Sequence, residues 1–337
     1  MQQRTGRPTS RDVAALAGVS VATVSYVLTG RATKVGAETR QRVLEAARQL
    51  DYAPNQSARS LRRRKTERIC LVVGSIGVPA YDQLARELHD KADEEGHGVL
   101  TIVVNNAQRA AQTIELLHQR IADGAVIASS VPFLDGDALR ALARSGLPLV
   151  VMSNELEPEG FDVVRAPERP ACTEAVDHLF AIGRKRVAYV GHHREVSGDS
   201  GNHERLAAYE DSIQRHGAKR IVVDGADDRV VAYRAVENLL RQKDKPDAIF
   251  AASDRAAISA IWAARDAGLA VPTDLAVVGV GNLEDGLITK PPLSTVGPPQ
   301  LDFSATTSML FERLAATDPP AGREVTTPWS FIQRESA

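Results

Sequence analysis

Cysteine and aromatic residues are scarce in this chain of 337 residues, and long apolar runs are missing. Only two cysteines occur, Cys70 and Cys172, each beside apolar residues. Buried free thiols in a reducing cytoplasm are therefore expected rather than a disulfide scaffold. No run of about 18 apolar residues and no apolar signal segment occurs, so neither a membrane partner nor export is expected. The length favours two or three globular cores.

Motifs that carry catalysis or hold metals are missing too. The sequence has no Gly-x-Ser-x-Gly elbow, no His-Glu-x-x-His pair and no phosphate loop. The glycines of Gly279–Gly286 faintly resemble a nucleotide loop, but Lys290-Pro291-Pro292 would stop the helix that should follow. His192, His193 and His203 lack further ligands, which favours one histidine facing a polar ligand over a metal site. We expect no enzyme activity, no cofactor and no metal.

Charge is divided unequally along the chain. Residues 1–66 hold 13 Lys and Arg against 4 Asp and Glu, whereas residues 67–337 hold 28 against 39. The net charge of −2 thus combines a head of +9 with a body of −11. A basic head on an acidic body predicts that the head binds a polyanion.

The head begins with the pattern of a short capped helix. Thr9 and Asp12 form an acidic variant of the capping box, because the acid lies three residues after the threonine. Val13, Leu16 and Ala17 then repeat at helical spacing, and a glycine suited to ending a helix follows. A first amphipathic helix is therefore expected to end at Ala17.

A second short helix follows after a tight turn, with Ser20 as its cap and Val21–Leu28 as its body. Its inward face is expected to hold Val24, Val27 and Leu28. Its outward face is small and uncharged, and holds Val21, Ala22, Ser25 and Tyr26. Two helices joined in this way predict a helix-turn-helix whose outward face can enter a DNA major groove. A third helix, about Ala37–Leu50, closes the small core.

The segment after this core ends in a leucine surrounded by cations. Leu61 follows a short run of small residues and precedes Arg62-Arg63-Arg64-Lys65. A leucine so placed can wedge into a minor groove while arginines hold phosphates. A flexible basic linker is the alternative reading of this segment. The DNA contacts expected here are Asn55, Ala58, Arg59 and Leu61.

The run SRDVAALAGVSVATVSYVLTG, followed by TRQRVLEAARQLDYAPNQSARSL, resembles the head of the lactose/galactose repressor (LacI/GalR) family, and the likeness continues to the C-terminus. The resemblance implies that some head residues contact phosphates or frame the recognition helix: Thr9, Ser20, Thr23, Ser25 and Thr29. It implies base reading by Val21, Ala22 and Tyr26, and intercalation by Leu61. Tyr26 stands where many members have Arg, and Thr29 replaces a frequent Asn.

From residue 68 onward, β-branched apolar runs alternate with helical patterns, which predicts parallel sheets wrapped by helices. The expected strands are Ile69–Val73, Val99–Val104, Ala125–Ile127, Leu149–Val151, Arg186–Val190, Ala248–Ala251 and Ala276–Val280. The expected helices are Tyr81–Glu95, Arg109–Ile121, Ala138–Ser145, Ala171–Ile182, Glu204–His216, Val230–Arg241 and Asp254–Ala267. The length accommodates two sheets, with a break near Arg165–Pro170 and a late helical segment, Pro291–Arg313.

The expected fold class is thus an all-α helix-turn-helix head on an α/β body. By resemblance, the body takes the two-lobed periplasmic-binding-protein-like (type I) fold with two parallel sheets. The expected domains are residues 1–53 for the DNA-binding head, 54–66 for a hinge helix and linker, and 67–337 for effector binding and dimerisation. Within the body, the N-lobe is expected at about 67–165 and 294–323, and the C-lobe at about 166–293 and 324–337.

Ligands of such sheets bind beyond the carboxyl ends of the strands. The effector-binding residues expected there are Ser75, Tyr81, Ser129, Ser153, His192, Ser253, Asp254 and Asn282. Small polar residues suit a pocket for a polar metabolite, but strand-to-helix loops also need them as helix caps, and that alternative stays open.

Arg205 matches the position of a ligand-binding arginine in the resembled family. A buried guanidinium there would grip a carboxylate or paired hydroxyls. Two positions depart from the sugar-sensing pattern: Gly281 stands where many relatives have Asp, and Ser253 where Asn is common. The expected effector is therefore a sugar or another polar metabolite.

A ligand-responsive regulator accounts for head, hinge and body together. A metabolite-binding module would account only for the body, and an enzyme would need catalytic groups that the sequence does not offer. We therefore expect a nucleoid-associated repressor that binds a pseudo-palindromic operator in double-stranded DNA and is controlled by an effector between its lobes. The sequence carries no heptad tail before Ala337, so a homodimer is the expected state.

Overall fold

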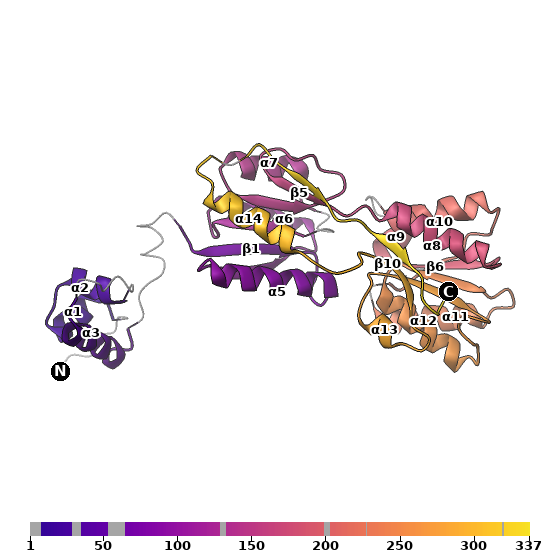
Figure 1. The fold of residues 1–337 in the computed structure, drawn as a ribbon, viewed down its shortest axis with the longest axis horizontal. Coiled ribbons are helices and arrows are strands. Elements are labelled where there is room, and N and C mark those ends of the chain that lie inside the picture. Colours follow the sequence, from indigo (N-terminus) through magenta and orange to yellow (C-terminus); the bar gives the residue numbers. More distant parts are fainter. Residues whose placement is uncertain are drawn as a thin grey trace. The chain divides into compact units, whose positions relative to one another are not determined.

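The computed structural model describes residues 8–28, 35–52, 65–128, 133–198, 203–226, 228–318 and 320–337. The chain divides into two compact units, Met1–Thr66 and Glu67–Ala337, here called the head and the body. The body has two lobes, each built around one six-stranded sheet (Figure 1).

The described part of the head contains α1 (Ser10–Ala17), α2 (Val21–Leu28) and α3 (Ala37–Gln49). The Asp12 carboxylate accepts hydrogen bonds from the Thr9 backbone N–H and hydroxyl, at 2.9 and 2.7 Å, which confirms the predicted cap. Gly18 ends α1 in the left-handed conformation, with φ of 64°. The buried core of the head consists of Val13, Ala14, Ala17, Val24, Val27, Val43, Ala46 and Ala47.

One apolar residue of the repeat in α1 lies at the surface of the head. The Leu16 side chain is 51% exposed, so it does not share the buried face of α1 with Val13 and Ala17. The buried stripe of this helix runs through Val13, Ala14 and Ala17. The alanine side chains are small enough to let α1 pack closely on its neighbours. Leu16 lies beside this buried stripe on the helix surface and faces solvent.

The N-lobe sheet is entirely parallel, in the order β11-β5-β4-β3-β1-β2. Its strands are β1 (Arg68–Val73), β2 (Gly98–Val103), β3 (Gly124–Ile127), β4 (Leu149–Met152), β5 (Asp162–Arg165) and β11 (Glu324–Thr326). Helices α5 (Pro79–Glu94) and α14 (Ser304–Ala315) supply the core on one face, and α6 (Ala107–His118) and α7 (Gly136–Arg144) on the other. Burial on both faces explains why β1 is apolar without alternation.

The C-lobe sheet has the order β12-β10-β9-β8-β6-β7. Its strands are β6 (Val187–Gly191), β7 (Val222–Asp224), β8 (Ala248–Ala251), β9 (Ala276–Val280), β10 (Ser294–Gly297) and β12 (Ser330–Ile332). Only β12 pairs antiparallel, with β10. The helices of this lobe are α8 (Arg169–Ala181), α9 (His193–Ser197), α10 (Glu204–Arg215), α11 (Arg229–Leu240), α12 (Asp254–Asp266) and α13 (Asp285–Ile288).

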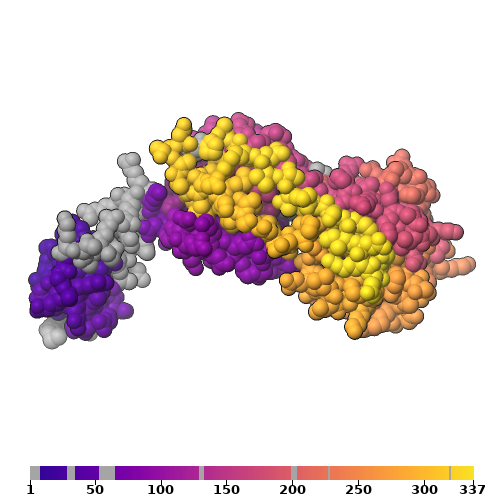
Figure 2. Space-filling view, viewed as in Figure 1, coloured from indigo at the N-terminus to yellow at the C-terminus, as the bar shows by residue number. Residues whose placement is uncertain are grey.

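The chain crosses between the lobes at residues 166–168, 298–303 and 327–329, and its last part extends over both lobes (yellow in Figure 2). These crossings correct the predicted lobe boundaries, because β10 belongs to the C-lobe and β11 to the N-lobe. They also correct the helical assignment of Pro291–Arg313, which contains β10, a crossing and most of α14. Pro298-Pro299 separates the two elements, since consecutive prolines lack the N–H groups that a helix needs.

Two predictions from composition can be compared with the structure. Cys70 and Cys172 are buried free thiols, as predicted, and burial raises the pKa of Cys70 to about 12. No single helix in the described ranges is long and apolar enough to cross a membrane. Only α1 and α2 taken together, bent by 102° at their break, reach that length and composition.

Candidate DNA-binding surface and effector pocket

Helix α2 presents an uncharged face to solvent. Val21 and Tyr26 are 43% and 54% exposed, and Ala22 and Ser25 lie on the same exposed side. On the opposite side, Val24 and Val27 are buried in the head core. The predicted division of this helix into two faces is confirmed, and its outward side chains carry no charge and, apart from Tyr26, are small.

Hydroxyl groups order the start of the same helix. The Ser20 Oγ accepts a hydrogen bond from the Thr23 backbone N–H at 3.1 Å and lies 2.9 Å from the Thr23 Oγ1. Ser20 is therefore the cap that the sequence predicts. The N-terminal end of a helix carries partial positive charge and favours a phosphate nearby. The other head residues expected to contact DNA lie outside the described residues: Thr29, Asn55, Ala58, Arg59 and Leu61.

A pocket with a cavity volume of about 110 Å³, partly open to solvent, lies where the three crossings pass between the lobes. Its walls come from the start of α5, the ends of β4 and β5, and all three crossings. The lining residues are Ala80, Tyr81, Met152, Ser153, Asn154, Val164, Ala166, Glu168, Pro298, Gln300, Leu301, Asp302, Phe303, Thr327 and Trp329. Two of the predicted effector residues, Tyr81 and Ser153, belong to this lining.

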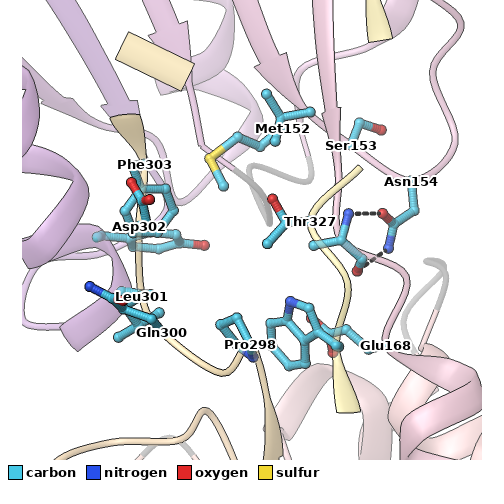
Figure 3. Close-up of a pocket in the computed structure, with 15 residues that line it drawn as sticks. Met152, Ser153, Asn154, Glu168, Pro298, Gln300, Leu301, Asp302, Phe303 and Thr327 are labelled. Carbon is cyan, nitrogen blue, oxygen red and sulfur yellow. Dashed lines mark hydrogen bonds between the residues drawn. The ribbon is translucent and has the colours of Figure 1, made fainter. Parts of the chain in front are cut away.

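The interior of this pocket is mainly apolar, with polar groups around it. Met152 and Thr327 project toward its centre, while Asp302 and Glu168 stand on opposite sides (Figure 3). An apolar cavity with a few placed polar groups is the usual form of a small-molecule site.

Asn154 holds the first crossing in place. Its side-chain amide donates to the Ala166 carbonyl at 2.9 Å and accepts from the Ala166 N–H at 2.7 Å (Figure 3). It also donates to the Glu204 carboxylate of α10 at 2.9 Å, and that carboxylate accepts the Glu168 N–H at 2.8 Å. One asparagine therefore links the end of β4 in the N-lobe to the start of α8 and α10 in the C-lobe.

Arg205 lies behind the pocket wall and is not part of the lining. Its Nε donates to Glu168 Oε2, its Nη2 donates to Glu168 Oε1 at 2.9 Å, and its Nη1 donates to the Ala252 carbonyl at 2.5 Å. Its guanidinium also lies 5.7 Å from the ring centre of Trp329, which does line the pocket. The predicted grip on a carboxylate is present, but the carboxylate belongs to the chain itself.

Four predicted effector residues lie outside the pocket lining. Ser253 caps α12, accepting from the Ala256 N–H at 3.2 Å and donating to the Ala226 carbonyl at 2.9 Å. Asn282 donates to the Pro298 carbonyl at 2.8 Å and accepts from Arg334 at 2.6 Å. His192 precedes α9, and Ser75 is exposed after β1. Ser253 therefore has the role of a helix cap, which the sequence had left open as an alternative to effector binding. Ser129 lies outside the described residues.

Asp254, the sixth predicted effector residue outside the lining when Arg205 is included, is 1% exposed at the start of α12. It accepts hydrogen bonds from the Thr295 hydroxyl at 2.6 Å and the Leu283 N–H at 2.7 Å. Burial raises the pKa of Asp254 to about 6, although both hydrogen bonds favour the ionised form. A Cβ at Gly279 would lie 2.3 Å from its Oδ1, so this glycine is needed for packing and requires no nucleotide.

Several lining residues escaped the sequence analysis because they come from the crossings rather than from strand ends. Glu168, Gln300, Asp302, Thr327 and Trp329 follow no helical or strand period. Trp329 carried the clearest usable signal, because it is one of only two tryptophans in the chain. In the described parts of the chain, no group of three or more His, Cys, Asp or Glu side chains is placed to hold a metal ion.

Comparisons with known proteins describe the same two parts. Residues 9–55 match the family described as "Bacterial regulatory proteins, lacI family". Residues 176–337 match the family described as "Periplasmic binding protein-like domain". Catabolite control protein A of Staphylococcus xylosus is 31% identical over 301 residues, which cover 87% of this chain and 88% of that protein. The HTH-type transcriptional repressor CytR of Escherichia coli K12 is 31% identical over 310 residues, which cover 90% of this chain and 88% of that protein.

Solved structures confirm the predicted fold class. The lac repressor dimer bound to operator and the anti-inducer ONPF shares 26% identity and a TM-score of 0.72, covering 98% of this chain and 99% of that chain. The complex of the transcriptional regulator CelR with cellobiose shares 26% identity and a TM-score of 0.64, covering 98% and 100%. CytR and CelR are named as a transcriptional repressor and a transcriptional regulator, in agreement with the prediction that the chain is no enzyme.

Proposed function

The chain belongs to the lacI family of bacterial regulatory proteins, and from this premise we propose that it is a dimeric repressor controlled by a small effector. Two heads would bind a pseudo-palindromic operator, and an uncharged or polar metabolite would bind between the lobes of each body. Such a protein would act in the cytoplasm, on the nucleoid. The observation that carries the proposal is the exposed, uncharged face of α2 within a head of net charge +9.

Two features of the head support DNA binding: its positive charge, which attracts phosphates, and the exposed face of α2, which can contact base edges. Its excess of cations would supply sequence-independent affinity for phosphates, which weakens as salt rises. Val21, Ala22 and Tyr26 would add apolar contacts and a phenolic hydroxyl at base edges. Because Tyr26 offers no guanidinium, its base preference would differ from that of relatives with Arg at this position.

The body supports effector control because the pocket is lined by the crossings themselves. Any ligand that contacts Glu168, Gln300 or Thr327 would contact a segment joining the two lobes. A change in the angle between the lobes would then follow from binding. Couplings of this kind change operator affinity by roughly 5- to 150-fold.

A cluster of exposed apolar side chains supports dimerisation. Val230 and Val231 on α11, Trp262 on α12, and Leu287 and Ile288 on α13 are 39–81% exposed. An ion pair of 3.1 Å between Arg229 and Asp285 joins α11 to α13, and α11 packs on α12. Exposed apolar groups gathered on neighbouring helices favour a protein partner, and we assign a second copy of this chain to that role.

The DNA-binding part of the proposal is tested by selecting duplexes from a random pool with the full-length protein at fixed salt. An enriched sequence with dyad symmetry is expected. Tyr26→Ala should then lower the ratio of specific to non-specific affinity by about 5- to 150-fold, as for the loss of one base contact. The control is Leu44→Ala, an exposed apolar residue of α3. Failure to enrich any sequence would contradict the proposed function.

Dimerisation through the apolar cluster is tested by Ile288→Asp, because Ile288 is 81% exposed and a charge there opposes apolar burial. Sedimentation should show a monomer, with operator affinity reduced by about 100-fold or more through loss of the second head. Ile182→Asp, at a 41% exposed position after α8, is the matched control and should remain dimeric. A dimeric Ile288→Asp protein would place the interface elsewhere.

A further inference from the structure

The charged groups of the pocket are acidic. Asp302 and Glu168 are the only charged residues among the described lining residues, which include no Lys, Arg or His. The body residues that the structure does not describe are 129–132, 199–202, 227 and 319, and the sequence has no Lys, Arg or His at these positions. A negatively charged ligand would therefore depend on a cation that stands behind the lining.

Arg205 is a cation of this kind, and every nitrogen of its guanidinium has an acceptor. Two nitrogens are taken by the Glu168 carboxylate in bidentate geometry and the third by the Ala252 carbonyl. Both side chains of the ion pair are only 21% exposed, so water screens this pair less than a surface pair. The Glu168 carboxylate raises the pKa of Arg205, which keeps the guanidinium charged.

Glu168 is held in this position from a second side. Its backbone N–H donates to Glu204 at 2.8 Å, and Glu204 in turn accepts from Asn154. The carboxylate of Glu168 thus occupies the place where an arginine in a ligand pocket would receive a carboxylate or phosphate. An anionic ligand would have to displace a prepositioned, partly buried partner.

We propose that Glu168 serves as a built-in carboxylate for Arg205 and thereby restricts the pocket to uncharged effectors that carry an apolar ring face. This inference rests on the proposed function, because it describes the effector of the same pocket. Asp302 is exposed and accepts a hydrogen bond from the Ser304 N–H at 2.8 Å. Water therefore screens the attraction between its carboxylate and a cationic effector. Tyr81, Phe303 and Trp329 supply ring faces, and Ser153 and Thr327 supply hydroxyls. Neutral sugars and nucleosides share this chemistry, whereas their phosphates and acids do not.

The inference is tested with inorganic sulfate as the anion and Trp329 as the reporter. Trp262→Phe leaves Trp329 as the only tryptophan and keeps an apolar side chain at position 262. Full-length protein is titrated with sulfate against chloride at equal ionic strength, while Trp329 fluorescence is recorded. The protein with Glu168 should show no saturable response. Glu168→Gln should give a saturable response, with a dissociation constant about 10- to 100-fold below the lower limit that the parent sets, because an ionic hydrogen bond to Arg205 becomes available.

Three further variants locate the response. Adding Arg205→Met to Glu168→Gln should abolish it, and Glu157→Gln, which removes a carboxylate paired with Arg165 at 3.2 Å, should resemble the parent. Glu168→Asp, whose carboxylate is one methylene shorter, should respond more weakly than Glu168→Gln and serves if the glutamine variant does not fold. A saturable response in the parent that Arg205→Met removes would overturn the inference, as would silence in both Glu168 variants.

Operator binding by the same Glu168 and Arg205 variants with Trp262 retained separates this inference from the proposed function, because Trp262 belongs to the apolar cluster assigned to dimerisation. An Arg205-dependent sulfate response in a protein without operator preference would reject the proposed function and keep the charge assignment. Operator binding without an Arg205-dependent sulfate response would keep the proposed function and reject the charge assignment.

Discussion

Among the residues that the structure describes, each lobe buries one aspartate, and the two lobes stabilise it in different ways. In the N-lobe, Asp162 is fully buried at the start of β5 and receives two guanidinium groups, from Arg313 at 2.6 Å and Arg323 at 2.7 Å. In the C-lobe, Asp254 is 1% exposed and receives a hydroxyl and a backbone N–H, with no ion pair among the described residues.

The two aspartates have different partners because they connect different elements of the fold. Asp162 and its arginines join β5, α14 and the segment before β11, so the N-lobe is closed by a charged cluster around the returning chain. Asp254 joins α12 to Thr295 of β10 and to Leu283, next to the second crossing. A carboxylate without a cation in a buried site retains its proton more readily. Stability near the second crossing should therefore depend on pH.

The largest expected effect comes from removing a cation in the N-lobe. Arg313→Ala should lower the free energy of unfolding of the body by about 3–5 kcal/mol, because it leaves the buried Asp162 charge partly unpaired. Arg313 also donates to the Pro320 carbonyl at 3.0 Å, which would lose its donor. Urea unfolding measures the loss. Arg140→Ala, which breaks a solvent-screened pair with Asp137, should leave the free energy of unfolding nearly unchanged, and equal losses would show that burial does not decide the effect.

A smaller effect should appear in the C-lobe as a function of pH. The folded-state pKa of Asp254, about 6, exceeds its ordinary value of 3.8, so the folded protein holds this proton more tightly than the unfolded chain. The associated stability is present below pH 4 and is lost as the pH rises through 6. The loss is roughly 3 kcal/mol.

Asp254→Asn should remove this dependence, so that the free energy of unfolding of the variant minus that of the parent rises by that amount between pH 4 and 7.5. Urea unfolding at several pH values gives the difference. If the difference were flat, the buried carboxylate would not be the origin of the pH dependence.

The smallest expected effect sharpens the same contrast. Thr295→Val removes the hydroxyl that hydrogen-bonds Asp254 and should cost about 1–2 kcal/mol at pH 7.5, where an ionised carboxylate loses a donor. The cost should shrink at pH 4.5, where the carboxyl is protonated. Thr307→Val is the matched control, because the buried Thr307 hydroxyl donates to a backbone carbonyl at 3.0 Å. Its cost should be the same at both pH values.

The sequence predicted the local features of this chain well. The capped start of α1, the bounds of α2 and its two faces, and most strands and helices of the body followed from spacing and cap residues. Short strands such as β7 and β11, of three residues each, carried too little pattern to detect. Of the predicted pocket residues that the structure describes, Tyr81 and Ser153 line the pocket, whereas Ser253 and Asp254 serve the packing of α12.

Two conclusions thus have different origins. The amino-acid sequence by itself determined the exposed, uncharged face of α2, because helical period and capping act over a few neighbouring residues. Only the tertiary structure decided which lobe receives β10 and β11, which crossings wall the pocket, and that Glu168 pairs with Arg205. Glu168 and Arg205 are 37 positions apart in the chain. Their pairing depends on how α8 and α10 pack, which no local pattern encodes.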